Sequence, residues 1–222
     1  ISKRSPSFNE QFYSCLYNIK ALNDEKYKSW DATIDYSFNF FGNEKISVTY
    51  YDIISKDKIV WIPSRQALQV PKNYGHVRHK GIEVEYSGKY FDNALGLTLL
   101  YNNNSAKSKS LMYSGDNSYN KQLVYTPEHK INCKLDFTYK NWNWLLYGMF
   151  TSERYYTNDN SPQNRLDSYF TIDAALTYRF EFYNIKNNLT VAVNNMLNEN
   201  YFIIQSYPMP LRTITFTYIL EI

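Results

Sequence analysis

The last ten residues of the chain constrain its fold more than any other stretch. Between positions 213 and 222 apolar and polar side chains alternate, with Ile219 as the exception. Alternation with a period of two is typical of a β-strand that has one apolar and one polar face. The apolar positions are Ile214, Phe216, Tyr218, Leu220 and Ile222. A tilted strand of this length can cross a lipid bilayer.

The same alternation recurs along the chain. It is clearest from Phe170 to Phe182, where the even-numbered residues are apolar. Other strands are expected at 30–40, 45–59, from 74, 95–101, 131–139, 142–156 and 188–195, and the opening segment 7–17 brings the number to about ten. Connections near 42, 92, 141 and 185 are short, whereas those near 18–27, 62–72, 102–126, 157–165 and 198–208 are longer. Short turns at one end and long loops at the other are typical of a bacterial barrel, whose turns and C-terminus are periplasmic.

Composition supports a membrane barrel and narrows the alternatives. Aromatic residues make up 18% of the chain, the mean hydropathy is −0.54, and no apolar run is long enough for a membrane helix. The net charge of +3 is scattered, which gives no reason to expect a nucleic-acid partner. A soluble β-sandwich also alternates, but the expected strands are longer than its usual five or six residues. The sequence therefore predicts an all-β, antiparallel transmembrane β-barrel.

The start of the chain and its two cysteines give little information about fold or function. The first residues contain no Met, basic segment or apolar segment of a signal peptide, so we expect residues 1–222 to be a fragment of a longer exported polypeptide. Cys15 and Cys133 fit no metal motif and no disulfide framework.

Several motifs resemble those of TonB-dependent outer-membrane receptors. Residues 194–201 (NNMLNENY) resemble the motif of the penultimate strand, and residues 208–212 (PMPLR) resemble the P-M-P-G-R that opens the last strand, with Leu211 in place of Gly. Upstream, residues 4–10 resemble an R-x-P-x-F-x-E strand, and Asn73 with Gly81 and Glu83 resembles N…G-x-E. Residues 125–129 resemble the x-P-x-H re-entry into the barrel, and residues 169–173 resemble y-x-x-x-D. Together these matches cover essentially the whole chain.

This resemblance implies a 22-stranded barrel around an N-terminal plug, of which the chain would form about the last ten strands. The plug, the TonB box and the first strands would lie outside the chain. The Pro-Met-Pro ending and the composition rich in Asn, Tyr and Lys favour the Bacteroidota branch of the family. The resemblance implies a receptor in the outer membrane of a Gram-negative bacterium that takes up a corrinoid or a ferric siderophore. The implied partners are the TonB complex through the plug, outer-membrane lipids, the barrel-assembly machinery, a small-molecule nutrient and a surface lipoprotein. No cofactor is expected.

Two groups of residues are candidates for function. Charged residues on the polar faces are expected to line the lumen, where they could solvate it, hold the plug or contact the transported solute: Asp31, Asp35, Glu83, Glu85, Lys134, Asp136, Asp173, Arg179 and Glu181. Aromatic residues in or near the long loops could stack on a ligand or form an aromatic girdle: Tyr113, Tyr119, Tyr155, Tyr156 and Tyr207.

Catalytic and metal sites are not indicated. His76 and His79 are three residues apart, so on a strand they face opposite sides and cannot easily share a metal. The alternatives to a receptor fragment are a complete ten-stranded outer-membrane protease or adhesin and a soluble sugar-binding β-domain. A rim protease would need clustered Asp and His residues at one end of the barrel, where only His79 and His129 are candidates.

Overall fold

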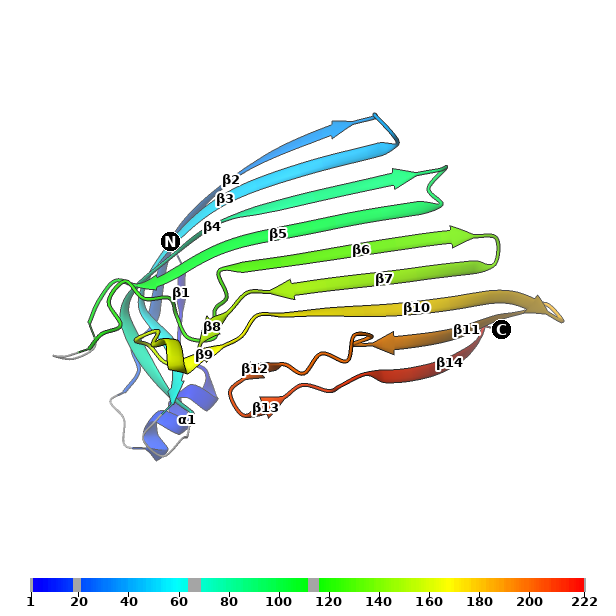
Figure 1. The fold of residues 1–222 in the computed structure, drawn as a ribbon. Coiled ribbons are helices and arrows are strands. Elements are labelled where there is room, and N and C mark those ends of the chain that lie inside the picture. The colour runs from blue at the N-terminus through cyan, green and yellow to red at the C-terminus, as the bar shows by residue number, and fades with distance from the viewer. Residues whose placement is uncertain (1, 18–20, 64–68, 112–115, 222) are drawn as a thin grey trace.

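Most of the chain forms one curved antiparallel sheet in which strands pair in sequence order (Figure 1). The computed structural model describes residues 2–17, 21–63, 69–111 and 116–221. Ten strands join in the sheet, in spatial order: β1 (Ser2–Arg4), β2 (Glu25–Phe38), β3 (Asn43–Pro63), β4 (Gln69–Tyr90), β5 (Leu95–Ser108), β6 (His129–Tyr139), β7 (Trp142–Thr151), β10 (Tyr169–Phe182), β11 (Ile185–Asn194) and β14 (Thr213–Glu221).

The remaining elements are short and gather at one end of the sheet, with helix α1 (Phe8–Leu16) following β1 (Figure 1). Two small hairpins are formed by β8 (Arg154–Tyr155) with β9 (Arg165–Leu166), and by β12 (Phe202–Ile204) with β13 (Tyr207–Pro208). A single 3₁₀ turn (Pro162–Asn164) precedes β9. The short turns that join β2 to β3, β4 to β5, β6 to β7 and β10 to β11 lie at the opposite end, which we call the turn end in contrast to the loop end.

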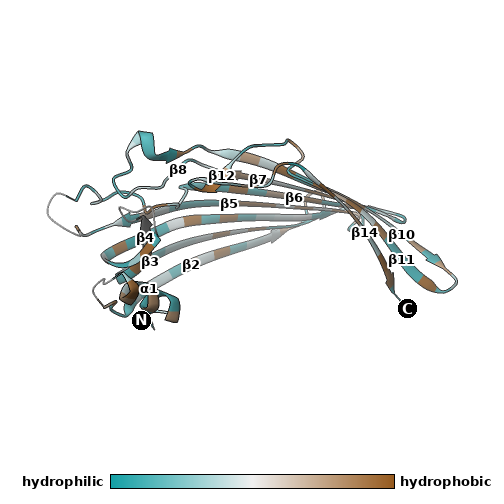
Figure 2. Cartoon of the chain, turned by 90° about the horizontal axis from the view of Figure 1, so that it is seen from below, coloured by the Kyte–Doolittle hydropathy of each residue, from teal (hydrophilic) through white to brown (hydrophobic). Residues whose placement is uncertain are grey.

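The register separates apolar from polar residues onto the two faces of the sheet. Residues directly opposite one another on paired strands lie on the same face. One row across five strands reads Phe216, Val191, Leu176, Trp144 and Phe137. The neighbouring row on the other face reads Thr217, Thr190, Thr177, Asn143 and Thr138. We call these the apolar face and the polar face, and Figure 2 shows hydropathy changing in bands along strands such as β2 and β4.

Aromatic side chains mark the turn end of the sheet. The tips of the short turns carry large rings that are mostly exposed: Phe40, Phe41, Phe91, Phe182 and Tyr183. Aromatic residues on the apolar face stack near this end, where the Trp142 and Tyr178 ring centroids are 4.5 Å apart. This arrangement is typical of the aromatic girdle at a membrane interface.

The sheet is not closed into a barrel within this chain. Strand β1 forms one edge and β14 forms the other. Every described residue of β14 is exposed, including Phe216 at 77%. Backbone groups on an open edge are costly in lipid, so both edges require further strands if the sheet lies in a membrane. None of the helices described here is long and apolar enough to cross a membrane.

The expected strand at 7–17 is wrong, because residues 8–16 form helix α1. The side chain of Ser7 accepts a hydrogen bond from the Glu10 amide, and the Glu10 carboxylate accepts one from the Ser7 amide. This capping box fixes the start of a helix. Its signature of Ser followed three residues later by Glu was readable in the sequence. The tenth strand of the sheet is instead β1.

The expected loops at 62–72 and 102–126 are shorter than the sequence indicated. Strands β3 and β4 remain paired through Trp61 opposite Pro71, and β5 continues to Ser108 opposite Val77. Pro71 is tolerated because it lies beyond the last residue that β4 shares with β5, where that side of β4 is an edge. The expected strand at 142–156 is likewise interrupted after Thr151, before the two residues of β8.

The register predicts opposite outcomes for two neighbouring substitutions in β10. Leu176→Arg places a charge on the apolar face, where arginine at the bilayer midplane costs roughly 2–4 kcal/mol of folding free energy. Thr177→Arg places the same charge on the polar face, where Thr177 is hydrogen-bonded to Thr190 at 2.9 Å, and we expect a smaller cost. Denaturant unfolding of the full-length protein in lipid vesicles measures both. Equal destabilisation by the two substitutions contradicts the register.

Candidate functional site

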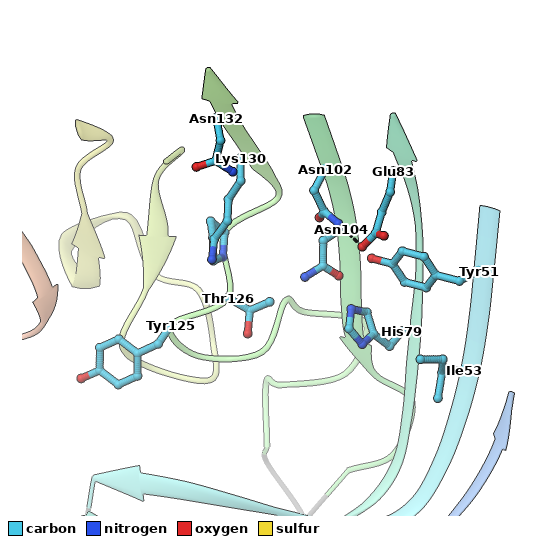
Figure 3. Close-up of a pocket in the computed structure, with 11 residues that line it drawn as sticks. Tyr51, Ile53, His79, Glu83, Asn102, Asn104, Tyr125, Thr126, Lys130 and Asn132 are labelled. Carbon is cyan, nitrogen blue, oxygen red and sulfur yellow. Dashed lines mark hydrogen bonds between the residues drawn. The ribbon is translucent and has the colours of Figure 1, made fainter. Parts of the chain in front are cut away.

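A pocket of about 540 Å³ opens on the polar face toward the loop end (Figure 3). We call it the wall pocket. Four strands and one loop supply its lining: Tyr51 and Ile53 from β3, His79 and Glu83 from β4, Asn102 and Asn104 from β5, Lys130 and Asn132 from β6, and Tyr125, Thr126 and Pro127 from the loop before β6. Because antiparallel strands alternate their faces, side chains far apart in sequence converge here.

The strand residues of the wall pocket are held by contacts across the sheet. The rings of Tyr51 and His79 meet edge to face with centroids 5.4 Å apart. The amide of Asn102 donates a hydrogen bond of 2.7 Å to the Glu83 carboxylate. Tyr51 lies opposite Gly81, where a side chain would collide with the Tyr51 hydroxyl at 2.5 Å. The glycine of the G-x-E motif therefore leaves room for the tyrosine ring.

Two atoms in the wall pocket lack hydrogen-bond partners. Within the described residues, His79 Nε2 and Asn104 Oδ1 are buried, and neither has a partner with hydrogen-bonding geometry. Buried polar atoms are nearly always paired in folded proteins. An imidazole nitrogen and an amide oxygen can bind a donor-bearing solute, water, or a side chain from another part of the protein. His79 and Asn104 also interact with each other, so a polar group that enters the wall pocket would add to this contact or replace it.

The loop that covers the wall pocket is fastened to β5 by the side chain of Gln122. Its amide nitrogen donates to the Asn104 carbonyl at 3.0 Å, and its oxygen accepts from the Ala106 amide at 3.0 Å. Next to it, Leu123 packs against Val77 and Ala106 in a small buried apolar cluster that also contains Val70. Gln122 and Leu123 therefore hold this loop against β4 and β5 beside the wall pocket.

Hydrogen bonds join three connecting segments over the polar face. The Asn160 side chain exchanges hydrogen bonds of 2.8 Å and 3.0 Å with the Gln122 backbone, and the Tyr125 amide donates to the Tyr155 carbonyl. Burial raises the pKa of Tyr125, partly offset by a backbone hydrogen bond from Gln205. Gln122, Asn160 and Gln205 belong to the loops 102–126, 157–164 and 199–207, which the sequence predicts to contact a ligand, and these three loops are therefore neighbours.

Arg154 fixes the last of these loops. Its side chain is 3% exposed, lies 5.1 Å from the Tyr169 ring centroid and donates to the Phe202 carbonyl. Tyr169 in turn stacks on Tyr201 with centroids 4.2 Å apart. Burial lowers the pKa of Arg154 from its usual value. A buried guanidinium bonded to backbone carbonyls and stacked on an aromatic ring explains how the β12–β13 hairpin is positioned.

The tyrosines expected in the loops differ in exposure where the structure describes them. Tyr113 lies outside the described residues. Tyr119 and Tyr207 are exposed at 58% and 70%, whereas Tyr155 and Tyr156 are half-buried. The Tyr156 hydroxyl donates to Asn164 at 3.0 Å. None of the four described tyrosines lines the wall pocket, which instead contains Tyr51 and Tyr125.

The nine charged residues expected in the lumen share the polar face of the sheet. Several have local partners there: Asp35 with Lys45 at 3.2 Å, Asp136 with Asn143 at 2.9 Å, and Asp173 with the Asn195 amide at 2.7 Å. Asp31 is opposite Tyr51, Glu85 opposite Ser47, Lys134 opposite Tyr147, Arg179 opposite Asn188 and Glu181 opposite Lys186. Only Glu83 lies in the wall pocket. That these residues line a lumen stays a prediction.

The histidines and cysteines are dispersed. His79 lies on the polar face, whereas His129 lies on the apolar face, where its Nδ1 is 3.0 Å from the Tyr101 hydroxyl. His76 faces the opposite side from His79. Cys15 is exposed on α1, and Cys133 is half-buried on the apolar face. Within the described residues, no group of three or more acidic, histidine or cysteine side chains could hold a metal ion.

Sequence reasoning missed most of the wall pocket. Asn102 and Asn104 fell in a segment assigned to a loop, and Tyr51, Lys130 and Asn132 have no individual signal. Strand parity was the available clue, because Tyr51, Glu83, Lys130 and Asn132 all fall on polar faces of their strands. The cover residues Tyr125, Thr126 and Pro127 belong to a motif that the sequence did identify.

Comparison with known proteins identifies the class. A family profile described as "TonB dependent receptor-like, beta-barrel" matches residues 2–196. The chain therefore belongs to the TonB-dependent receptor β-barrel family. A search of curated protein sequences gave no match.

Solved structures of large receptors share the fold at low sequence identity. The ferric preacinetobactin receptor BauA of Acinetobacter baumannii is 15% identical, with a TM-score of 0.66, and the match covers 90% of this chain and 30% of that chain. The ferric citrate transporter FecA, unliganded, is 17% identical, with a TM-score of 0.71 and coverage of 98% and 33%. The copper transporter OprC is 15% identical, with a TM-score of 0.71 and coverage of 98% and 35%. The chain spans about a third of the length of these structures.

The R-x-P-x-F-x-E motif now has a structural explanation. Arg4 holds Glu10 with two hydrogen bonds of 3.0 Å and 3.1 Å, and its Nε donates to Glu25 at 2.6 Å. Glu25 is 1% exposed and also accepts from the Ile59 amide at 2.6 Å. Helix α1 is thereby fastened to β2 and β3. Burial raises the pKa of Glu10, but hydrogen bonds from Arg4 and Ser7 outweigh it, so the net shift is downward.

Acid should release helix α1. A carboxyl group whose pKa is lower in the folded state stabilises the fold above its unfolded pKa of about 4.3, and this contribution is lost as the pH falls through the lowered value. In full-length protein with Cys133→Ser, a spin label on the exposed Cys15 should gain mobility in that acid range. With Glu10→Gln, the label should already be mobile at neutral pH.

Glu153→Gln is the matched control, because Glu153 pairs with Arg165 at 2.9 Å in a different loop and is half-exposed. This variant should keep the normal acid response of the label. A label that stays equally immobile in the Glu10→Gln variant across the whole pH range overturns the role given to this ion pair.

Proposed function

We propose that the full-length protein is an outer-membrane transporter that binds a chelated nutrient and passes it through the lumen. The observation that carries the proposal is the wall pocket on the polar face of a sheet whose other face is apolar. Ligand sites are concave and combine aromatic walls with a few convergent polar groups. Here the Tyr51 and Tyr125 rings combine with Glu83, Lys130 and the buried polar atoms His79 Nε2 and Asn104 Oδ1.

The chemistry of the wall pocket suits a solute rich in oxygen donors and acceptors. Lys130 and the amide groups of Asn102 and Asn132 supply donors, whereas Glu83 and Asn104 Oδ1 supply acceptors. Ferric siderophores present carboxylate, hydroxamate or catecholate oxygens, and the names of several structural neighbours refer to ferric chelates. A ferric siderophore is therefore the favoured nutrient, and a corrinoid is the second candidate. Transport energy would come from the TonB complex acting on a plug domain.

The other partners follow from the surfaces of the fold. The apolar face would contact outer-membrane lipid, and the exposed edge strand β14 would be presented to the barrel-assembly machinery. The loop end, with Tyr119 and Tyr207 exposed, would meet the nutrient or a surface lipoprotein that delivers it. The protease alternative gains no support, because its two histidine candidates lie on opposite faces of the sheet.

Uptake by intact cells tests the proposed function. Cells that produce the full-length protein should accumulate radioactive iron supplied as ferric siderophores, and the accumulation should stop when the TonB complex is deleted. Radioactive cobalamin, supplied in parallel, distinguishes the corrinoid alternative. Cells that accumulate none of these solutes above a strain lacking the protein contradict the proposal.

Substitutions in the wall pocket should weaken this uptake. Asn104→Leu fills part of the pocket and removes an acceptor, and Tyr51→Phe removes a hydroxyl. The pair should reduce uptake at limiting concentration at least about tenfold, which corresponds to about 1.4 kcal/mol of binding free energy. The amount of folded receptor in the membrane should not change. Tyr183→Phe, which removes an exposed hydroxyl in the β10–β11 turn at the opposite end of the sheet, is the matched control. Normal uptake by the pocket variant contradicts a solute-binding role for the wall pocket.

A further inference from the structure

The polarity of helix α1 is reversed relative to that of an ordinary surface helix. Its inner side includes the polar residues Glu10 and Ser14, which are 7% and 6% exposed. Its outer side carries Phe8, Phe12 and Leu16, which we call the apolar stripe and which are 81%, 50% and 59% exposed. A surface helix normally directs its apolar side toward the core and its polar side toward water. The reversal indicates that the apolar stripe is an interaction surface.

The apolar stripe runs without interruption along the helix. Residues four positions apart lie on one face of a helix, so Phe8, Phe12 and Leu16 form a single row. The rings of Phe8 and Phe12 are stacked with their centroids 6.2 Å apart. Glu10 is the only charged residue between positions 8 and 16, and it lies on the inner side. The apolar stripe therefore has no charge beside it on the helix.

Contacts on the inner side fix the helix with the apolar stripe outward. Arg4 donates two hydrogen bonds of 3.0 Å and 3.1 Å to the Glu10 carboxylate. The ring of Tyr13 meets the ring of Trp61 on β3 edge to face, with centroids 5.4 Å apart. Because Arg4 belongs to the edge strand β1, these contacts also place α1 beside the open edge of the sheet.

The open edge indicates which segment of the full-length protein comes next to α1. Within the described residues, β1 pairs only with residues 25–27 of β2, so residues 28–38 have no partner on that side. Since β1 is antiparallel to β2, the chain upstream of Ser2 would continue this strand to the turn end beside residues 28–38, as a lipid environment requires. If strands there also pair in sequence order, a short turn and one further strand lead back to the loop end. The loop reached at that point would be the neighbour of α1.

The size and charge of the apolar stripe favour a segment of the same chain over a separate molecule. A helix of nine residues is about 14 Å long and about 10 Å wide. Its outer side is therefore much smaller than the roughly 800 Å² that each partner buries in a standard complex between proteins. A helix that binds a membrane surface usually carries Lys or Arg, and α1 has neither. A segment of the same chain needs less contact area, because it loses no freedom of association.

We propose that the apolar stripe is the docking site for the first loop at the loop end upstream of β1 in the full-length protein. Apolar side chains of that loop would cover Phe8, Phe12 and Leu16. The matched parts of BauA and FecA are 30% and 33% of those chains, so structures with this fold contain further chain that can occupy such a position. Helix α1 would then join the upstream loop to β2 and β3 through Arg4 and Glu25. This contact is independent of the proposed uptake of a nutrient.

Photo-crosslinking in intact cells identifies what covers the apolar stripe. The full-length protein carries a benzophenone amino acid in place of Phe12, and peptides crosslinked by light are identified by mass spectrometry. The expected product is an intramolecular crosslink to the first loop at the loop end upstream of β1. The same amino acid in place of Tyr183, an exposed aromatic residue in the β10–β11 turn, is the matched control and should not reach that loop. Crosslinks from position 12 only to a second copy, another protein or lipid overturn the proposal, as does the absence of any crosslink in folded receptor.

Thiol labelling of purified full-length protein measures the cover directly. Phe12→Cys, combined with Cys15→Ser and Cys133→Ser, should react slowly with a water-soluble maleimide. Replacing the upstream loop by a short Gly-Ser linker should make this reaction at least about tenfold faster, because protection is lost with the contacts that provide it. Tyr183→Cys in the same background should react at one rate with and without the loop, and heat-modifiability on gels reports folding. Equal rates at position 12 with and without the loop overturn the proposal. Neither measurement uses a transported solute, so a failure here leaves the proposed function intact.

Discussion

The fold depends on the requirement that backbone polar groups be paired where no water can reach them. In a bilayer an unpaired peptide group costs several kcal/mol, so a strand must be hydrogen-bonded on both sides. This ladder uses the backbone in the plane of the sheet and leaves the side chains to alternate above and below it. Each strand can therefore present one surface to lipid and another to a lumen. The rows that contain Leu176 and Thr177 show this separation across five strands.

The two faces of β4 carry different side chains within three residues. His79 lines the wall pocket, while Arg78 and Lys80 lie on the opposite face. The period of two of a strand lets residues this close in sequence be separated by the thickness of the sheet. Gly81 leaves space both for the Tyr51 ring and for the backbone of β5, because a side chain there would collide with the Tyr51 hydroxyl and the Asn103 carbonyl.

Much of the sheet could be predicted from the sequence because lipid imposes a strict pattern. Strands such as 170–182 and 131–139 alternate cleanly where one face meets lipid, and their positions were found within one or two residues. Beyond the membrane both faces of a strand meet water, so the alternation fades. This is why Asn102–Ser108 was assigned to a loop although these residues pair with β4. Helix α1 was missed because its aromatic residues were read as part of the strand rhythm, whereas the Ser7–Glu10 capping box decides its start.

The wall pocket could not be predicted because it depends on contacts between distant residues. Gln122 reaches across to β5, Asn160 reaches back to Gln122, and Arg154 holds the carbonyl of Phe202. Each interaction joins segments whose separation is set only after the sheet has formed. The sequence around such polar loop residues has no periodic pattern that would predict their contacts. Their hydrogen-bond partners are determined by the register of the strands on either side.

The central claim, that one face of this sheet meets lipid up to a defined level, is most directly tested by spin labels placed one at a time from position 76 to position 90 of β4. The full-length protein, with Cys15 and Cys133 replaced by serine, would be reconstituted in lipid bilayers, and collisions with oxygen and with a water-soluble nickel complex would be measured. Labels at even positions from Ile82 to Tyr86 should collide mainly with oxygen, and their odd neighbours mainly with nickel. At Lys80 and Arg78 the oxygen preference should be lost. Equal accessibility of neighbouring positions, or oxygen preference at the odd ones, would contradict the account.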